Sequence, residues 1–147
     1  MMPRYVLMTW LLLLATGSPA LAEPPGVSGS WIAQAESVRV AVPGRDRYSQ
    51  ALGAAAPAGA QVASVSWQYT TPPGAQVTAW LCHPQRCQQL AGHRGRSEAL
   101  AGLSATEPLH FRFRLGQGAR PVQVSGLQVI VDHRQVADPK AQKTVGQ

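Results

Sequence analysis

Acidic residues are scarce in this sequence, which contains seven Asp and Glu residues among its 147. Most of them fall in expected turns or near the chain ends, and no two form a recognisable acid–base pair. The sequence also lacks a G-x-S-x-G motif, an H-E-x-x-H motif and a phosphate-binding glycine loop. We therefore predict no enzyme activity, no catalytic residue and no cofactor.

A hydrophobic run long enough to span a membrane is missing as well. The longest apolar stretch, 6–15, has ten residues, whereas a membrane-spanning helix needs about 20. It follows a basic residue and precedes Ala20 and Ala22, whose small side chains suit a signal peptidase. We expect residues 1–22 to be a signal peptide that is cleaved before Glu23, with export from the cytoplasm and no stable membrane insertion afterwards. The remaining chain of about 125 residues is long enough for one hydrophobic core.

Dense clusters of positive charge are also absent, although the chain is basic. It has 13 Lys and Arg residues and a net charge of +6. Apart from Arg4, the basic residues are scattered from Arg39 to Lys143 without interleaved aromatic side chains, unlike those of a nucleic-acid-binding surface. We predict no nucleic-acid partner. A solvated surface explains this charge, and so does attraction to an acidic partner outside the cytoplasm.

The sequence does contain apolar and polar residues that alternate with a period of two, as in half-buried strands. The clearest case is 109–115, where Leu109, Phe111, Phe113 and Leu115 alternate with polar residues. Weaker patterns cover 38–42, 62–69, 77–81 and 127–134, and the pattern of 62–69 places Val62 and Val65 on opposite faces. Glycine and proline turns separate these segments. The pattern predicts an all-β fold, a single antiparallel β-sandwich or barrel-like domain of about seven or eight short strands over residues 23–134.

Helix signals are nearly absent. Residues 50–60 are rich in alanine, but Gly53, Pro57 and Gly59 interrupt any helix, so we expect a flexible connection between two strands. Residues 97–104 are expected to form one short helical turn. The polar tail, 135–147, has no apolar periodicity and is expected to be disordered.

Two cysteines enclose four residues, and their number and the expected export favour a disulfide between Cys82 and Cys87. Such a short loop gains about 2 kcal/mol in the chain-entropy estimate, so the bond would hold one hairpin tip and not the whole fold. The alternative is a copper or zinc site formed by Cys82, His83, Cys87 and His93, which lie within twelve residues. That spacing matches no familiar zinc finger.

Trp80 raises the alternative of a glycan- or cell-wall-binding module. An exposed tryptophan on a β-sandwich can stack on a sugar ring, and alternation places Trp80 opposite Val77, Ala79 and Leu81. Packing within a core or across strands is the competing explanation, and the sequence favours it.

Five short blocks, in this order and behind a signal peptide, resemble the flagellar protein FlhE family. The blocks are Gly29-Ser30-Trp31, Val65-Ser66-Trp67-Gln68, Leu81-Cys82-x4-Cys87-x2-Leu90-x-Gly92, Leu109-His110-Phe111-Arg112-Phe113 and Gln128-Val129-x-Val131-x-His133-Arg134. They cover roughly residues 29–134, and the alanine-rich segment and the tail depart from the family pattern.

The resemblance implies a periplasmic accessory protein of flagellar assembly, with protein partners in the type III export gate or the rod. It implies a role in preventing proton leakage through the export channel, or in chaperoning, and no catalytic residues. A homo-oligomer is compatible with it. As the partner contact we predict the tip that the two cysteines close, with the basic residues around it: His83, Arg86, His93, Arg94 and Arg96. The alternative is that these charges only keep the loop soluble.

Overall fold

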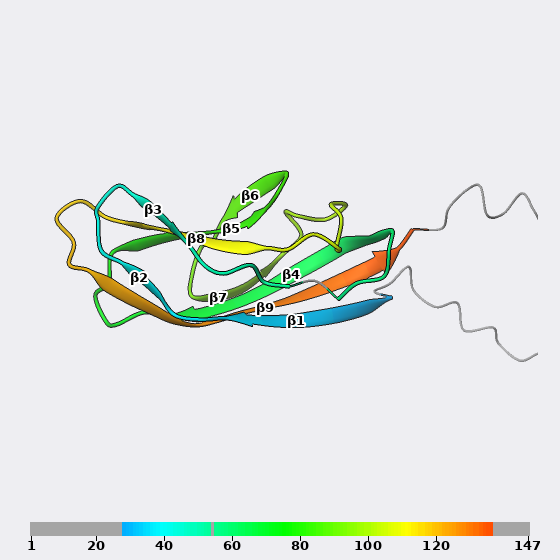
Figure 1. Ribbon diagram of the computed structural model, residues 1–147, viewed down its shortest axis with the longest axis horizontal. Helices are drawn as coiled ribbons and strands as arrows, with labels where there is room; N and C mark the ends of the chain where they lie inside the picture. The colour runs from blue at the N-terminus through cyan, green and yellow to red at the C-terminus, as the bar shows by residue number, and fades with distance from the viewer. Residues whose placement is uncertain (1–27, 54, 137–147) are drawn as a thin grey trace, which may run out of the picture.

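The computed structural model describes residues 28–53 and 55–136, which form nine strands and no helix (Figure 1). The expected signal peptide with its cleavage site lies outside the described residues, and so does the tail beyond residue 136. The last strand continues to Gln135, so the first residue of the expected tail pairs in a sheet. No helix in the described residues is long and apolar enough to cross a membrane.

The strands form two antiparallel sheets, which Figure 1 shows as stacked layers. The larger sheet has the order β1-β9-β4-β7, and β2 also pairs with β9. Its members are β1 (Gly29–Ala35), β2 (Val38–Val40), β4 (Ala60–Thr70), β7 (Arg94–Ser97) and β9 (Val122–Gln135). The smaller sheet has the order β3-β8-β5-β6 and consists of β3 (Asp46–Tyr48), β5 (Val77–His83), β6 (Arg86–Gln89) and β8 (His110–Leu115). The predicted all-β fold is confirmed.

The core lies between the two sheets and is filled by the alternating apolar residues that the sequence displays. Phe111 and Phe113 of β8 are fully buried, and their rings stack at 5.8 Å. Tyr69 of β4 packs edge-on against both rings from the opposite sheet, and burial raises the pKa of its hydroxyl. Val129 and Val131 of β9 complete the facing layer. These contacts explain why the alternation in 109–115 and in 127–134 correctly predicted strands with one buried face.

Strand β4 departs from simple alternation. A register shift in its pairing with β9 lies between Val62 and Ser64, so a β-bulge inserts one extra residue there. As a result Val62 and Val65 are both buried in the core, at 1% exposure each. The prediction that these two valines lie on opposite faces was wrong, because a bulge reverses the alternation on one side of it.

Two connecting segments differ from their expected form. Residues 98–103 form turns, with hydrogen bonds from Ala101 N to Glu98 O and from Leu103 N to Leu100 O, so the expected helical turn is absent. The alanine-rich connection does join β3 to β4, but it is anchored at Leu52. Leu52 is fully buried and exchanges two backbone hydrogen bonds with Leu109, of 2.8 and 3.2 Å.

Candidate functional site

The β5–β6 hairpin carries the two cysteines at directly opposed positions. Cys82 pairs with Cys87 across the hairpin, their Cα atoms are 4.0 Å apart and their sulfurs form a disulfide. The predicted disulfide is therefore confirmed. It also removes both thiolates from the alternative copper or zinc site, since an oxidised sulfur cannot bind metal as a thiolate. The described residues contain no group of three or more side chains placed to hold a metal ion.

His83 is the last residue of β5, directly before the turn of this hairpin, and it is buried to 4% exposure. Its Nδ1 accepts a hydrogen bond from the backbone N–H of Gln85, so its Nε2 donates to the carbonyl of Ser104 at 3.0 Å. These bonds shape the turn and attach the hairpin to the 98–109 segment. Both ring nitrogens of His83 are used inside the fold, so the predicted partner contact of this residue has no free ring nitrogen to support it.

The remaining basic residues do not gather at one tip. Arg86 is exposed at the hairpin turn, whereas Arg94 and Arg96 lie on β7, which belongs to the other sheet. The Arg96 guanidinium is 2.8 Å from an oxygen of Asp132, and that carboxylate also accepts a hydrogen bond from Ser64 Oγ. Proximity in sequence suggested one cluster, but the chain crosses between the sheets after β6 and divides it.

His93 precedes β7 and is exposed, but its ring is held in place. It packs against Tyr69 with ring centroids 4.8 Å apart, and its Nε2 lies 3.2 Å from Thr71 Oγ1. Arg86 and Arg94 are therefore the two arginines of the predicted contact set that are exposed and form no ion pair within residues 28–53 and 55–136.

The outer face of the smaller sheet carries a row of aromatic and arginine side chains. Trp80 on β5 pairs with Arg112 on β8, which pairs in turn with Tyr48 on β3. The Arg112 guanidinium lies 4.3 Å from the centroid of the Trp80 ring, and that of Arg114 lies at 5.7 Å. Trp80 is thus half-buried on the outer face of its sheet, and the Arg112 guanidinium covers one face of its ring.

Asp46 neutralises part of this positive row. Its carboxylate accepts a 2.7 Å hydrogen bond from Arg114 Nε and lies 4.0 Å from Arg112 Nε. The hydrogen bond from Arg114 holds the pKa of this carboxyl below its usual value, and the charges of both arginines add to the effect. No sequence signal marks Asp46 as the partner of Arg114, because the pairing of β3 with β8 that places them opposite each other joins distant segments of the chain.

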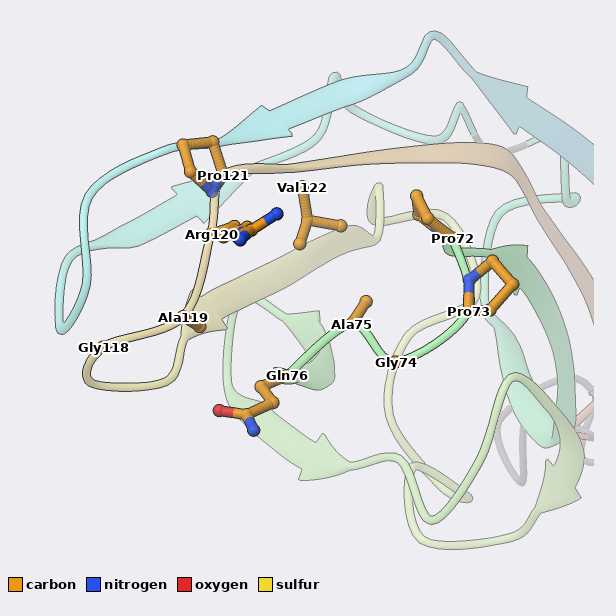
Figure 2. Close-up of a pocket in the computed structure, with 10 residues that line it drawn as sticks. All are labelled: Pro72, Pro73, Gly74, Ala75, Gln76, Gly118, Ala119, Arg120, Pro121 and Val122. Carbon is orange, nitrogen blue, oxygen red and sulfur yellow. The ribbon is translucent and has the colours of Figure 1, made fainter.

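A cleft with a volume of about 400 Å³ lies at one end of the sandwich. Figure 2 shows its two sides, the turn 72–76 between β4 and β5 and the turn 118–122 between β8 and β9. Three prolines line it, and Arg120 is its charged residue. No carboxylate, histidine, cysteine or hydroxyl is among its lining residues, so the cleft offers no nucleophile and no acid–base pair.

The fold and these surfaces define a small antiparallel β-sandwich with a disulfide-closed hairpin. The comparisons with known proteins then identify the particular family. The family model described as "Flagellar protein FlhE" matches residues 37–134, which is more than half of the chain. The chain belongs to the flagellar protein FlhE family, as the ordered sequence blocks predicted.

Individual relatives agree with this assignment. The flagellar protein FlhE of Escherichia coli (strain K12) is 32% identical over 123 residues, covering 79% of this chain and 92% of the relative. That of Yersinia enterocolitica is 39% identical over 119 residues, covering 73% and 82%. A crystal structure of FlhE superimposes with a TM-score of 0.67 at 30% identity, covering 73% of this chain and 97% of that one. The chain is therefore a flagellar accessory protein of a family not known for enzymes.

Proposed function

We propose that this protein acts in the periplasm, where it contacts protein components of the flagellar type III export apparatus or the rod. In this proposal it prevents proton leakage through the export channel, chaperones a flagellar component, or does both. The observation that carries the proposal is the match to the FlhE family model over residues 37–134. The Cys82–Cys87 disulfide supports the compartment, because such bonds persist in oxidising environments such as the periplasm.

The contact surface in this proposal includes the exposed tip of the β5–β6 hairpin. Arg86 lies at a turn that is constrained in two ways. The Cys82–Cys87 disulfide links the two strands beside it, and the hydrogen bonds of the His83 ring fix the turn to the rest of the fold. A rigid turn loses little conformational entropy on binding, and a guanidinium forms paired hydrogen bonds with a carboxylate. Arg94 adds a second exposed guanidinium on β7, an edge strand of the other sheet. Both features favour an acidic protein surface as the partner.

A deletion strain tests the function. Removing the gene should produce defective flagellar assembly or a proton leak, measured by motility, hook-protein secretion and cytoplasmic pH in acidic medium. The full-length sequence should restore all three, and a version without residues 1–22 should not. A deletion strain that is normal in all three measurements would overturn the proposal.

Charge reversal tests the contact surface separately. We expect Arg86→Glu with Arg94→Glu to fail in complementation although the protein accumulates and folds normally. Arg39→Glu with Arg120→Glu is the matched control, because it makes the same charge change at two exposed arginines outside the proposed contact surface. Normal complementation by the variant with both Arg86 and Arg94 reversed would exclude the hairpin tip and β7 as the contact and leave the flagellar role itself intact.

A further inference from the structure

Strand β1 is an open edge of the larger sheet. Its seven residues pair with β9 on one side, and no strand among residues 28–53 and 55–136 pairs with the other side (Figure 1). An unpaired edge presents backbone N–H and C=O groups to another strand, and proteins usually protect it with charge, proline, a bulge or short length. The sequence of β1, GSWIAQA, has no charged residue and no proline, and its pairing with β9 shows no register shift.

The centre of this edge is apolar on the solvent side. Ile32 is 63% exposed, the largest exposed fraction among the large hydrophobic residues of the described chain. Its cross-strand neighbour on β9 is Ile130, which is partly exposed on the same outer face. Ser30 and Gln34 flank Ile32 on that face, so a short apolar row reaches the edge between polar neighbours.

The edge is also self-complementary. Ile32 is the fourth of the seven residues Gly29–Ala35, so a two-fold axis at this residue pairs β1 with a second β1 over its whole length. In that antiparallel register Ile32 faces its own copy, and each Ser30 faces a Gln34, whose amide can hydrogen-bond to the serine hydroxyl. The row Ile130–Ile32 then continues without a break into the second molecule.

We propose that β1 is a self-association edge, at which two copies of this chain pair antiparallel about Ile32 and join their larger sheets. An interface of this kind uses the same surface on both molecules and closes after two copies. The occupant is a second copy and not an unrelated extended segment, because the apolar residue lies at the midpoint of the strand. The proposal goes beyond the flagellar function and does not depend on it.

The edge is short, so we expect a weak dimer in exchange with monomer. Sedimentation of the protein made from its full-length sequence, over a range of concentrations, should show reversible dimerisation. Ile32→Lys places two positive charges opposite each other and should raise the dimer dissociation constant by about tenfold or more. The matched control is Val42→Lys, which makes a similar change at another exposed apolar residue, 49% exposed and outside β1, and should leave dimerisation unchanged.

Cysteine cross-linking tests the register. Ile32→Cys introduces the only unpaired thiol, and directly opposed positions in antiparallel strands have Cα atoms about 4.5–5.5 Å apart, within disulfide range. With oxidised glutathione as oxidant, this variant should form a covalent dimer on a non-reducing gel. Ser30→Cys alone should not, because its two copies lie four residues apart along the strand, roughly 13 Å. An equimolar mixture of Ser30→Cys and Gln34→Cys proteins should cross-link.

The outcomes separate the possible occupants. A protein that stays monomeric at every concentration, with no Ile32→Cys dimer, overturns the proposal and leaves the edge open to a different partner. Cross-linking of Ser30→Cys alone as efficient as that of Ile32→Cys overturns the register. A dimer that survives Ile32→Lys unchanged places the interface elsewhere and also overturns it.

Discussion

The two edges of the larger sheet differ in length, charge and exposed surface. β7 has four residues, of which two are arginines, and Arg96 is paired with Asp132. β1 has seven residues, carries no charge and exposes Ile32 at its centre. A short, charged edge resists pairing with another strand, and a long, neutral one permits it. The same sheet therefore has one protected edge and one that is available for contact.

Both edges are held to the core by a tryptophan. Trp31 on β1 is buried, and its indole N–H donates to the carbonyl of Ala105 at 3.2 Å. Trp67 lies on β4, next to the other edge, and its indole N–H donates to the carbonyl of Gly92 at 3.0 Å. The ring of Trp67 covers Gly95 of β7. The edges thus differ in what they present to solvent and resemble each other in how they are anchored.

The largest expected effects come from removing these anchors. Trp67→Ala and Trp31→Ala should each reduce the free energy of unfolding by about 3–5 kcal/mol in chemical denaturation, because each leaves a cavity in the core. Hydrogen exchange should accelerate in β7 for the first variant and in β1 for the second. Trp80→Ala, on the outer face, is the control and should cost less. Equal acceleration at both edges in either variant would contradict independent anchoring.

The next effect comes from glycines that lie beside rings. A Cβ atom at Gly95 would lie 2.5 Å from the Trp67 ring, whereas one at Gly29 would lie 2.9 Å from the imidazole of His133. Gly95→Ala should lower the free energy of unfolding by about 1–3 kcal/mol, because a tryptophan held by a hydrogen bond cannot move away freely. Gly29→Ala should lower the free energy of unfolding by less, since Gly29 is the first residue of β1. Gly53→Ala meets no atom within 4 Å and is the neutral control.

Removing the charges of β7 should weaken the contrast between the edges. Arg94→Thr with Arg96→Thr should lower the free energy of unfolding by at most about 1 kcal/mol, because the Arg96–Asp132 pair is exposed on the arginine side. The double variant should also scatter more light at high concentration, since its second edge is now neutral. The control is Arg134→Thr on β9, which removes an exposed charge from a strand that is paired on both sides. Unchanged scattering would mean that short length alone protects β7.

The smallest effect concerns β3, an edge of the other sheet. The hydrogen bond from Arg114 lowers the pKa of Asp46 in the folded state, so this carboxylate stabilises the fold above its unfolded pKa near 3.8. The contribution is lost as the pH falls through the lower folded pKa. We expect a few tenths of a kcal/mol, because the Arg114 side chain is half-exposed. Asp46→Asn should reduce stability at pH 6 and converge with the unmodified protein near pH 2, measured by thermal unfolding.

Much of the fold was predictable from short-range pattern, and the failures have physical causes. Phe111 and Phe113, and likewise Val129 and Val131, were placed correctly on one face of their strands, because one buried face imposes alternation on a strand. β1 and β3 were not delineated as strands. β3 has three residues, too few to show a period, and β1 combines a glycine, a serine and two alanines with only two large apolar residues.

The candidate site was less predictable than the fold. The disulfide could be predicted from the cysteine spacing and the expected export. The burial of His83 could not, because it depends on a hydrogen bond to the carbonyl of Ser104, which is distant in the sequence. The pattern around Val62 failed because nothing in the sequence marks the bulge in β4. The stacking of Arg112 on Trp80 requires β8 to lie beside β5, a pairing between distant segments.

The sequence by itself determined which residues alternate, which two cysteines can meet and which family the chain resembles, because these properties depend on neighbours along the chain or on their order. The tertiary structure decided which sheet each strand joins, and so it separated Arg86 from Arg94 and buried His83. It also left β1 at an edge, paired with the last strand of the described chain. Strand partners are chosen by long-range packing and backbone hydrogen bonding, which local pattern does not encode.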